Sequence, residues 1–254
     1  MNNKIAVVTG VSRLKGIGKA ICLELATRKY DIFFTYWTEY DKTMPWGIDK
    51  KEPDQIQQEL LALGIKCEKL ELDLGEDHAS ARLFDSIQNS LGSPSVLINN
   101  ATYSTSTSID TLEAKELDHH YRVNLRATTL LIAEFVKRFE FKNNGRIINL
   151  TSGQSLGPMP NEIAYAITKG AIETLTKTLA TEIAKKGITI NAVNPGPNDT
   201  GWMNDELKAN LIKEFPMNRI GKPSDTAKLI GFLCSEDAEW ITGQIIHSEG
   251  GFKR

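Results

Sequence analysis

Residues 5–18 read Ile-Ala-Val-Val-Thr-Gly-Val-Ser-Arg-Leu-Lys-Gly-Ile-Gly, an apolar run that passes directly into a glycine-rich loop. An unbroken apolar run is typical of a parallel strand that is covered on both faces of its sheet. Gly10, Gly16 and Gly18 let the backbone turn tightly and approach a bound pyrophosphate closely. The helix expected from Gly18 onward would offer free N–H groups and a partial positive charge to that anion. The stretch therefore predicts a strand, a phosphate-binding loop and a helix, with a glycine-rich turn that binds nothing as the alternative.

The rest of the chain repeats this alternation of short apolar runs and longer amphipathic segments. Strands are predicted at residues 5–9, 32–37, 66–72, 96–99, 146–151, 188–193 and 245–247. Helices are predicted at 18–29, 54–63, 79–91, 112–139, 163–186 and 227–235, with a bend or break near Val123 and a C-cap at Gly187. Strands that alternate with helices form parallel β-α-β units. We predict one α/β domain over residues 1–254, a doubly wound, Rossmann-like parallel sheet of about seven strands with helices on both faces.

Two segments interrupt the alternation, at residues 38–53 and 195–223. The first carries Trp46 among prolines, a glycine and several charges, and the second is rich in Gly, Pro and Asn with a short helix predicted around 206–214. Loops of this length are usually functional or mobile. Ligands of such sheets bind at the carboxyl ends of the strands, where these loops lie. For residues 38–53, a surface insertion without a role is an equally open alternative.

Composition excludes several classes of protein. The 254 residues carry a net charge of -2, which argues against a general nucleic-acid binder because such proteins are basic. Cys22, Cys67 and Cys234 are too widely spaced for a metal site or a disulfide framework, so we expect reduced thiols, no metal and a cytoplasmic protein. The apolar run at 5–8 is shorter than a signal-peptide core. No stretch of ~18 apolar residues occurs, so we expect no membrane-spanning helix.

Tyr165-Ala-Ile-Thr-Lys169 places a phenol and an ammonium four residues apart, on one face of a predicted helix. A free phenol has a pKa of ~10, too high for acid–base catalysis near neutrality. A cation ~4 Å away at an effective dielectric of ~20 contributes ~4 kcal/mol. That energy lowers a pKa by at most ~3 pH units, and desolvation opposes part of the effect. The pattern predicts a tyrosine that titrates near physiological pH, with a surface helix pair as the alternative.

Two further polar residues accompany this pair. Ser152 follows the predicted strand 146–151 at the carboxyl edge of the sheet, where its hydroxyl could hydrogen-bond a substrate oxygen that gains charge. Asn124 lies inside a predicted helix although asparagine has a poor helix propensity. The alternative for Asn124 is a core amide that bonds to the backbone. Together the four side chains favour an enzyme over a protein that only binds a dinucleotide.

These motifs resemble those of the short-chain dehydrogenase/reductase family along the whole chain. Residues 9–18 resemble its Thr-Gly-x-x-x-Gly-x-Gly loop, with two extra residues between Gly10 and Gly16 that should make the loop bulge. The resemblance implies that Tyr165 is the acid–base residue and that Ser152 stabilises the substrate oxygen. It also implies that Lys169 binds the nicotinamide ribose and lowers the tyrosine pKa, while Asn124 helps to hold a water that relays protons to Lys169. The matched catalytic tetrad is Asn124, Ser152, Tyr165 and Lys169.

The resemblance also assigns the cofactor contacts. Residues 73–74 follow the third predicted strand, where such enzymes contact adenine, and 99–102 resemble the family's Asn-Asn-Ala-Gly except that Thr102 replaces the glycine. Residues 195–200 resemble a Pro-Gly loop whose threonine meets the nicotinamide carboxamide. The residues assigned to the cofactor are Gly10, Ser12, Arg13, Gly16, Ile17, Gly18, Tyr36, Asp73, Leu74, Asn100, Ala101, Tyr165, Lys169, Pro195, Gly196, Asn198 and Thr200.

The residue at the end of the second strand separates NAD from NADP enzymes of this architecture. An NAD enzyme commonly has Asp or Glu there to hold the ribose 2′-hydroxyl. Here that position is Tyr36, followed by Trp37 and Thr38, so no carboxylate repels a 2′-phosphate. Arg13 can reach toward that phosphate, as a matching arginine often does in the family. A solvated loop cation is one alternative, and the other is that the two-residue expansion brings Lys15 or Trp37 into its place. We therefore expect NADP(H).

The closest overall resemblance is to 3-oxoacyl-(acyl-carrier-protein) reductases. It implies an NADP(H)-dependent oxidoreductase that moves a hydride between nicotinamide and a carbonyl or alcohol carbon. A 3-oxoacyl thioester is one candidate substrate, and a free ketone, sugar or steroid-like alcohol stays open. Gln154, Met159 and Trp202 are predicted to border the substrate pocket, by their nearness in sequence to Ser152 and Thr200. A non-catalytic dinucleotide-sensing regulatory protein is the alternative, although such a protein has no reason to keep the tetrad.

The two long predicted helices bear on partners. Lys137, Arg138 and Lys142 could attract an acidic carrier protein, with a solvated helix end as the alternative. Relatives in the family pair these helices across a dyad, so we expect a homo-oligomer, a tetramer with two-fold symmetric interfaces. The apolar positions in excess of what one sheet face can cover include Leu130, Leu131, Phe135, Ile172, Leu175 and Leu179. No nucleic-acid or membrane partner is expected.

Overall fold

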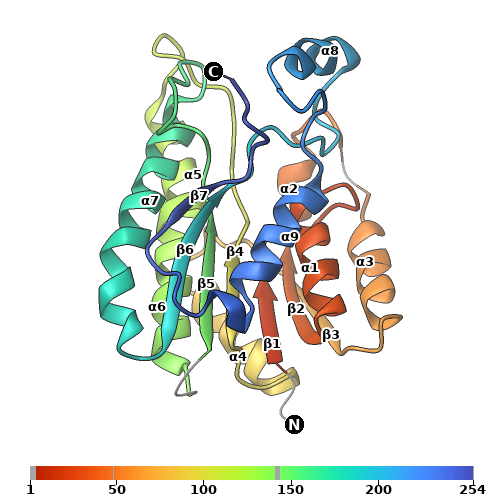
Figure 1. Ribbon diagram of the computed structural model, residues 1–254, viewed down its shortest axis with the longest axis vertical. Helices are drawn as coiled ribbons and strands as arrows, with labels where there is room; N and C mark the ends of the chain where they lie inside the picture. Colours follow the sequence, from red (N-terminus) through yellow and green to blue (C-terminus); the bar gives the residue numbers. More distant parts are fainter. Residues whose placement is uncertain (1–3, 48, 141–143, 254) are drawn as a thin grey trace.

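Seven parallel strands form one sheet with helices on both faces (Figure 1). The structure, a computed structural model, describes residues 4–47, 49–140 and 144–253. The strand order β3-β2-β1-β4-β5-β6-β7 runs outward from β1 on one side and from β4 on the other, so the carboxyl ends of β1 and β4 flank a crevice where such sheets bind ligands. The strands are β1 Lys4–Val8, β2 Tyr30–Tyr36, β3 Cys67–Glu71, β4 Val96–Asn99, β5 Gly145–Leu150, β6 Ile188–Asn194 and β7 Ile245–His247.

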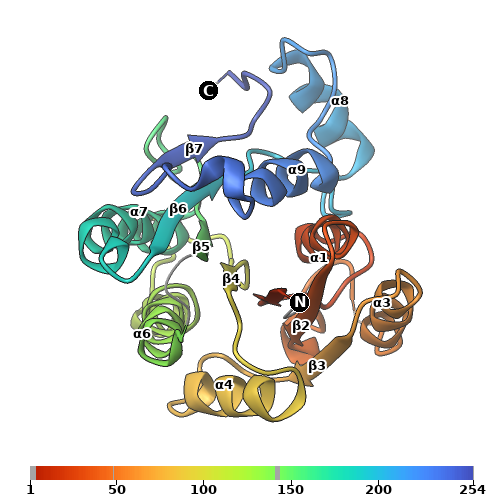
Figure 2. The ribbon, with the colours of Figure 1, turned by 60° about the horizontal axis from the view of Figure 1, so that its bottom comes forward.

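Helices cover both faces because neighbouring strand residues point in opposite directions. Val8 belongs to a core that α1, α3 and α9 complete, whereas Val7 belongs to a core completed by α4, α6 and α7 (Figure 2). The helices are α1 Ile17–Thr27, α2 Thr38–Asp41, α3 Glu52–Leu61, α4 Ala79–Ser90, α5 Ala114–His120, the π-helix η1 Tyr121–Ala127, α6 Thr128–Arg138, α7 Ile163–Ala184, α8 Asp205–Lys213, α9 Pro223–Leu233 and the 3₁₀ helix η2 Glu236–Ala238. The predicted doubly wound parallel sheet is confirmed.

The largest differences from the predicted elements lie at helix starts. α3 begins at Glu52 and α9 at Pro223, each a few residues earlier than predicted, because proline is accepted in the first turn of a helix where its missing N–H costs nothing. The segment predicted as a loop from residue 38 contains the short helix α2. A helix of four residues has no periodicity from which it could be predicted.

The long helix predicted at 112–139 is neither bent by proline nor broken. It runs from α5 through η1 into α6 without an interruption, and the irregularity expected near Val123 is the π-helix η1. A π-helix closes its hydrogen bonds one residue further along the chain than an α-helix and frequently lies at a functional site. Asn124 lies in this π-helix and is buried.

The apolar surface expected on the two long helices is smaller than predicted. Leu131, Phe135 and Ile172 are buried in the core of the chain itself, and Leu175 and Leu179 pack against that core. Of the six positions, Leu130 alone is exposed, at 40%. The prediction was wrong for the others because neighbouring helices cover α6 and α7 in addition to the sheet: α4 packs on α6, and α5 and η1 pack on α7.

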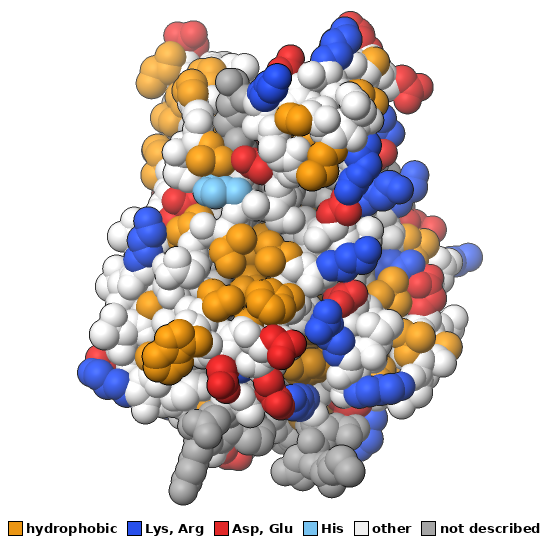
Figure 3. Space-filling view, viewed as in Figure 1, with side chains coloured by type: hydrophobic (Ala, Val, Ile, Leu, Met, Phe, Trp, Pro, Cys, Tyr) orange, Lys and Arg blue, Asp and Glu red, His pale blue; other side chains and the backbone are white. Residues whose placement is uncertain are grey.

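Charged side chains of both signs are mixed on the face shown in Figure 3, and hydrophobic side chains gather near its middle. At the end of α6, Arg138 pairs with Asp85 at 2.6 Å and with Glu134 at 2.6 Å. Lys137 lies 3.9 Å from Glu134, and Lys142 lies outside the described residues. The arginine expected to attract an acidic carrier is therefore already paired within the chain.

Cys22, Cys67 and Cys234 are buried free thiols, as predicted. Within the described ranges, no helix has both the length and the apolar character needed to cross a membrane.

Candidate active site

The loop after β1 is fastened to the loop after β4. Asn100 Nδ2 donates to Thr9 O at 2.8 Å and to Gly10 O at 2.9 Å, and the Thr9 hydroxyl accepts the backbone N–H groups of Asn100 and Ala101, each at 3.0 Å. Gly10 has a φ of +73°, and a Cβ there would lie 2.6 Å from Ala101 Cα. Only glycine fits this position, so the two loops form one rigid rim of the crevice.

The start of α1 fits the phosphate groups of a dinucleotide. The N-cap residue is Gly16, which supplies no side-chain cap, and the first turn of the helix contains no acidic residue. The first N–H groups of a helix lack partners within the helix, and they carry a partial positive charge that favours an anion. A Cβ on Gly18 would lie 2.8 Å from Gly10 O, so the glycine keeps the helix close to the loop. This cradle has the donors and the close backbone approach that a pyrophosphate needs.

The two extra residues of the loop make a bulge that is bound to α3. Leu14 N–H donates to Glu52 Oε2 at 2.7 Å. Glu52 is in the first turn of α3, so a carboxylate from that helix occupies one of the loop's N–H donors. Sequence reasoning missed Glu52, because the 38 residues that separate it from Leu14 give no spacing signal.

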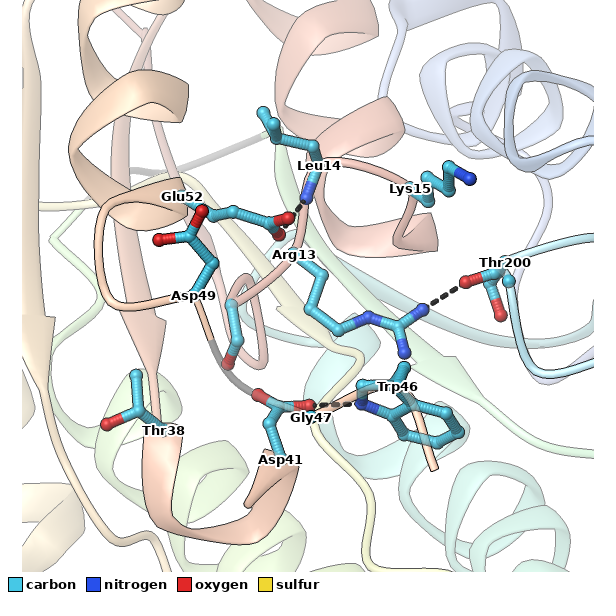
Figure 4. Close-up of a pocket in the computed structure, with 12 residues that line it drawn as sticks. Arg13, Leu14, Lys15, Thr38, Asp41, Trp46, Gly47, Asp49, Glu52 and Thr200 are labelled. Atoms are coloured by element: carbon cyan, nitrogen blue, oxygen red, sulfur yellow. Dashed lines mark hydrogen bonds between the residues drawn. The ribbon is translucent and has the colours of Figure 1, made fainter. Parts of the chain in front are cut away.

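Arg13 reaches across the crevice (Figure 4). Its guanidinium donates to Thr200 O, and its carbon lies 4.3 Å from the centre of the Trp46 ring. Burial lowers the pKa of Arg13, whereas Asp41 and Glu52 raise it. These residues line a cavity of about 350 Å³.

The end of β2 carries no carboxylate, as the sequence indicated, because the strand ends at Tyr36. Asp41 and Glu52, further along the chain, nevertheless bring negative charge beside Arg13, which sequence reasoning missed.

Several predicted cofactor residues have structural partners of their own. Asp73 Oδ1 accepts the N–H of Gly75 at 2.7 Å, and Leu74 is buried. Asn198 Nδ2 donates to Pro195 O at 2.7 Å and to Gly196 O at 3.2 Å, so this amide holds its own loop together. The contacts of these residues with a cofactor stay predictions.

Ser152, Tyr165 and Lys169 come together at the carboxyl end of β5. Ser152 lies just past the end of β5, and Tyr165 and Lys169 lie on α7. A hydrogen bond from Ser152 connects the serine to the phenol, and Lys169 Nζ lies 5.4 Å from the centre of the Tyr165 ring. The ammonium donates to Leu150 O at 2.8 Å. A proton donor, a hydrogen-bonding hydroxyl and a cation therefore meet beside the crevice.

Asn124 connects the loop after β4 with α7. Its Oδ1 accepts Tyr103 N–H at 2.7 Å and the Thr102 hydroxyl at 3.1 Å. Its Nδ2 donates to Tyr103 O at 2.9 Å and to the Thr168 hydroxyl at 3.1 Å. The bonds to the Tyr103 backbone agree with the alternative prediction for Asn124, a core amide that bonds to the backbone. The contacts also explain why threonine stands at position 102 where the family has glycine: the Thr102 hydroxyl donates to Asn124 Oδ1, and glycine has no hydroxyl.

The pKa of Tyr165 moves opposite to the sequence prediction. Burial raises it well above the ordinary value for a phenol, the Glu162 carboxylate raises it further, and the bond from Ser152 lowers it. Burial lowers the pKa of Lys169 to about 8. The prediction treated the pair as half-solvated, whereas desolvation dominates both groups. The phenol therefore keeps its proton at neutral pH.

Glu162 is a site residue that sequence reasoning missed, although its spacing three residues before Tyr165 was visible. It is the N-cap residue of α7, and burial raises the pKa of its carboxyl group. Residues three apart on a helix are neighbours. The Glu162 carboxylate therefore disfavours a second negative charge, that of a Tyr165 phenolate.

In the dehydrogenase that the sequence predicts, Glu162→Gln should move the alkaline rise of alcohol oxidation to lower pH. Removal of the carboxylate lowers the pKa of Tyr165, so the phenolate that accepts the alcohol proton forms earlier as pH rises. On the rising limb, each pH unit of displacement gives a ~10-fold higher rate at fixed pH. The measurement is kcat/KM against pH. Glu182→Gln, an exposed change on the same helix, should leave the profile in place. An unmoved profile in Glu162→Gln would refute the coupling.

The three predicted substrate residues lie in different settings. Gln154 Nε2 donates to Glu173 Oε1 at 2.6 Å, so its amide is bound to α7. Trp202 Nε1 donates to Asn198 O at 3.0 Å, while its ring is 46% exposed. Met159 O accepts the N–H of Glu162 at 3.1 Å, beside the start of α7. Their contacts with a substrate stay predictions.

The segment 38–53 also reaches the active site. The Tyr40 hydroxyl donates to Ser104 O at 3.1 Å, and its ring lies 5.6 Å from the Tyr103 ring. Tyr40 is among the groups that raise the pKa of Tyr165. The segment therefore contacts the wall of the candidate site, and its role there stays a prediction.

Comparison with known proteins finds relatives along the whole chain. A family model described as enoyl-(acyl carrier protein) reductase matches residues 10–253. The uncharacterized oxidoreductase YjdA of Bacillus subtilis is 51% identical over 99% of this chain and 97% of its own. The 3-oxoacyl-[acyl-carrier-protein] reductase FabG of Staphylococcus epidermidis is 32% identical over 98% of each chain. The structure is similar to that of a short chain dehydrogenase from Burkholderia cenocepacia in complex with NADP, with a TM-score of 0.85 and 27% identity over 98% of this chain and 97% of that one.

Proposed function

Because this chain belongs to the short-chain dehydrogenase/reductase family, we propose that it is an NADP(H)-dependent oxidoreductase that acts on a carbonyl or alcohol carbon. The observation that carries the proposal is the convergence of Ser152, Tyr165 and Lys169 beside a glycine loop that fits a dinucleotide. A protein that only senses a dinucleotide needs the loop but not this convergence. The nicotinamide, when bound, supplies or accepts the hydride.

Residues of the chain itself supply the proton for the substrate oxygen and stabilise the negative charge that develops on it. In reduction, the phenol of Tyr165, which its raised pKa keeps protonated at neutral pH, donates its proton to the substrate oxygen. Ser152 hydrogen-bonds the same oxygen as it gains negative charge. The cation of Lys169 stabilises the phenolate that remains and would hold the nicotinamide ribose. In oxidation the phenolate must form first, so this direction requires a higher pH.

The preference for NADP(H) rests on charge. No carboxylate ends β2, and the cavity next to it is lined by the cations Arg13 and Lys15 as well as by the carboxylates Asp41, Asp49 and Glu52. A charge-assisted hydrogen bond is worth ~1.5–3 kcal/mol, so one contact from Arg13 to a 2′-phosphate would favour NADPH over NADH by roughly 10- to 150-fold. Asp41 and Glu52 beside Arg13 oppose part of this preference. The NADP bound to the Burkholderia cenocepacia relative supports the same choice.

The substrate class that we propose first is a 3-oxoacyl thioester, because the FabG relative covers nearly the whole chain. Free ketones come next. We also propose a cytoplasmic homo-oligomer, a tetramer in the family's manner. Ile167, 60% exposed on α7, joins Leu130 among the apolar side chains available to a second copy.

The direct experiment follows NADPH absorbance with purified protein against acetoacetyl thioesters, small ketones, sugars and steroid ketones. We expect oxidation of NADPH with at least one of these carbonyl compounds, and a weaker reaction with NADH. Binding of NADPH without turnover on any of them would favour the regulatory alternative. Faster turnover and tighter binding with NADH would overturn the cofactor assignment.

A further inference from the structure

The segment between β2 and α3 makes one wall of the cavity beside the phosphate loop (Figure 4). α2 starts directly after β2, and Trp46 follows α2 by five residues. Trp46 Nε1 donates to Asp41 Oδ1 at 2.8 Å. Asp41 is buried, at 6% exposure, so the bond holds the indole in a fixed position relative to α2. The wall therefore has a definite shape rather than that of a free surface loop.

The indole supports Arg13. The guanidinium lies over the ring, 4.3 Å from its centre, and this geometry is attractive because the ring face is negative. An arginine side chain loses much rotational freedom when a charged group binds it, and prior ordering reduces that loss. Trp46 orders the guanidinium without neutralising it, which the neighbouring carboxylates Asp41 and Glu52 would do if they paired with it directly.

The cavity lies where the ribose 2′-phosphate of NADP(H) is expected. Thr38 lies two residues past Tyr36, the end of β2, and lines the cavity together with Ser12 and Arg13. In dinucleotide-binding sheets the end of this strand meets the 2′ position of the ribose. Trp46 lines the same cavity, and its ring lies against the guanidinium of Arg13.

We propose that Trp46 and Asp41 are positioning residues that hold Arg13 for the 2′-phosphate, so that discrimination between NADPH and NADH depends on them. The inference rests on the proposed NADP(H)-dependent function. Trp46 acts through Arg13 and Asp41 acts through Trp46, so loss of either affects the cofactor that carries the extra phosphate. The other cofactor, which lacks that phosphate, does not use the oriented guanidinium.

The test is fluorescence titration of NADPH and NADH with the whole protein. In Trp46→Ala we expect NADPH to bind ~3- to ~30-fold more weakly, the range of a cation–π contact between exposed and desolvated sites, with NADH unchanged. Trp46→Phe keeps an aromatic face and should retain most of the preference. Asp41→Asn and Asp41→Ala both remove the carboxylate charge that opposes the preference, but only Asp41→Asn keeps an acceptor for the indole N–H, so Asp41→Ala should bind NADPH ~3- to ~30-fold more weakly than Asp41→Asn does. Trp240→Ala, a change at a side chain that is 95% exposed, is the matched control and should alter neither affinity.

The outcomes separate this inference from the function on which it rests. A wild type that binds NADH more tightly than NADPH would overturn the cofactor assignment and the inference together. If the wild type prefers NADPH, a Trp46→Ala variant that keeps the full preference, together with an Asp41→Ala variant that binds NADPH as tightly as Asp41→Asn, would overturn the inference and leave the function standing. An equal loss of affinity for both cofactors in folded Trp46→Ala would also overturn the inference, because the indole would then support the binding of both cofactors and not the 2′-phosphate alone. If Trp46→Ala does not fold, Asp41→Ala against Asp41→Asn decides the question.

Discussion

Tyr165→Phe is expected to lower kcat for carbonyl reduction by ~10²- to ~10⁴-fold, the usual contribution of a positioned general acid. The substitution removes one oxygen and keeps the ring, so the packing around α7 and the binding of NADPH should change little. What is lost is the proton that the neutral phenol holds at neutral pH because burial and Glu162 raise its pKa. The measurement is kcat under saturating NADPH, together with the NADPH dissociation constant.

The matched control for this variant is Tyr121→Phe. Tyr121 lies on η1 and is 51% exposed, so its hydroxyl is lost at the surface rather than at the active site. We expect wild-type turnover from this control. Undiminished turnover in Tyr165→Phe itself would rule out the phenol as the proton donor.

Gly10→Ala is expected to cost about 1–3 kcal/mol of folding free energy, the range for a residue held in an unfavourable backbone region. For a chain of this size that corresponds to a decrease in Tm of roughly 2–12 °C. The φ of Gly10 is +73°, and the new Cβ would lie 2.6 Å from Ala101 Cα and 2.9 Å from Ala101 N. Ala101 must therefore move, which loosens its 3.0 Å bond to the Thr9 hydroxyl. Weaker cofactor binding should accompany the loss of stability.

Gly64→Ala separates the two causes. Gly64 has a φ of +77°, close to that of Gly10, but a Cβ there would have no atom within 4 Å. This control should show the backbone strain alone and leave cofactor binding intact. Equal effects of both substitutions on Tm and on NADPH affinity would show that the contact with Ala101 contributes nothing.

The sheet could be predicted from the sequence because each strand is a short apolar run that signals its own burial. The run 5–8, for example, became the four buried residues of β1. The convergence of Ser152, Tyr165 and Lys169 could be predicted because these residues are close in sequence or match a family pattern, while the roles of the tetrad stay predictions. The contact of Arg13 with Trp46 could not be predicted, because the two residues are 33 positions apart with α1, β2 and α2 between them, and no periodicity connects them.

The direction of the Tyr165 pKa could not be predicted for a different reason. A spacing of four residues places Lys169 on the same helix face, but it does not show how much water the pair keeps. Burial raises the pKa of the phenol and lowers that of the ammonium, and Tyr40, which lies on α2 in a distant part of the chain, also raises the pKa of the phenol. Charge spacing is a local property of the chain, whereas solvation is a property of the complete fold.

The π-helix η1, in the middle of the long helix, determines the direction in which the side chains of α6 point. An α-helix advances about 100° per residue, so one extra residue in a turn rotates all later side chains by that angle relative to the earlier ones. Asn124 faces the loop after β4, while Leu131 and Phe135 further along face the sheet. A helix of uniform α-geometry could satisfy one of these alignments but not both. Deletion of one residue from 121–127 would therefore turn either Asn124 away from Tyr103 or the apolar stripe of α6 away from the core. The part of the helix that carries Asn124 and the part that packs on the sheet could then no longer both keep their contacts.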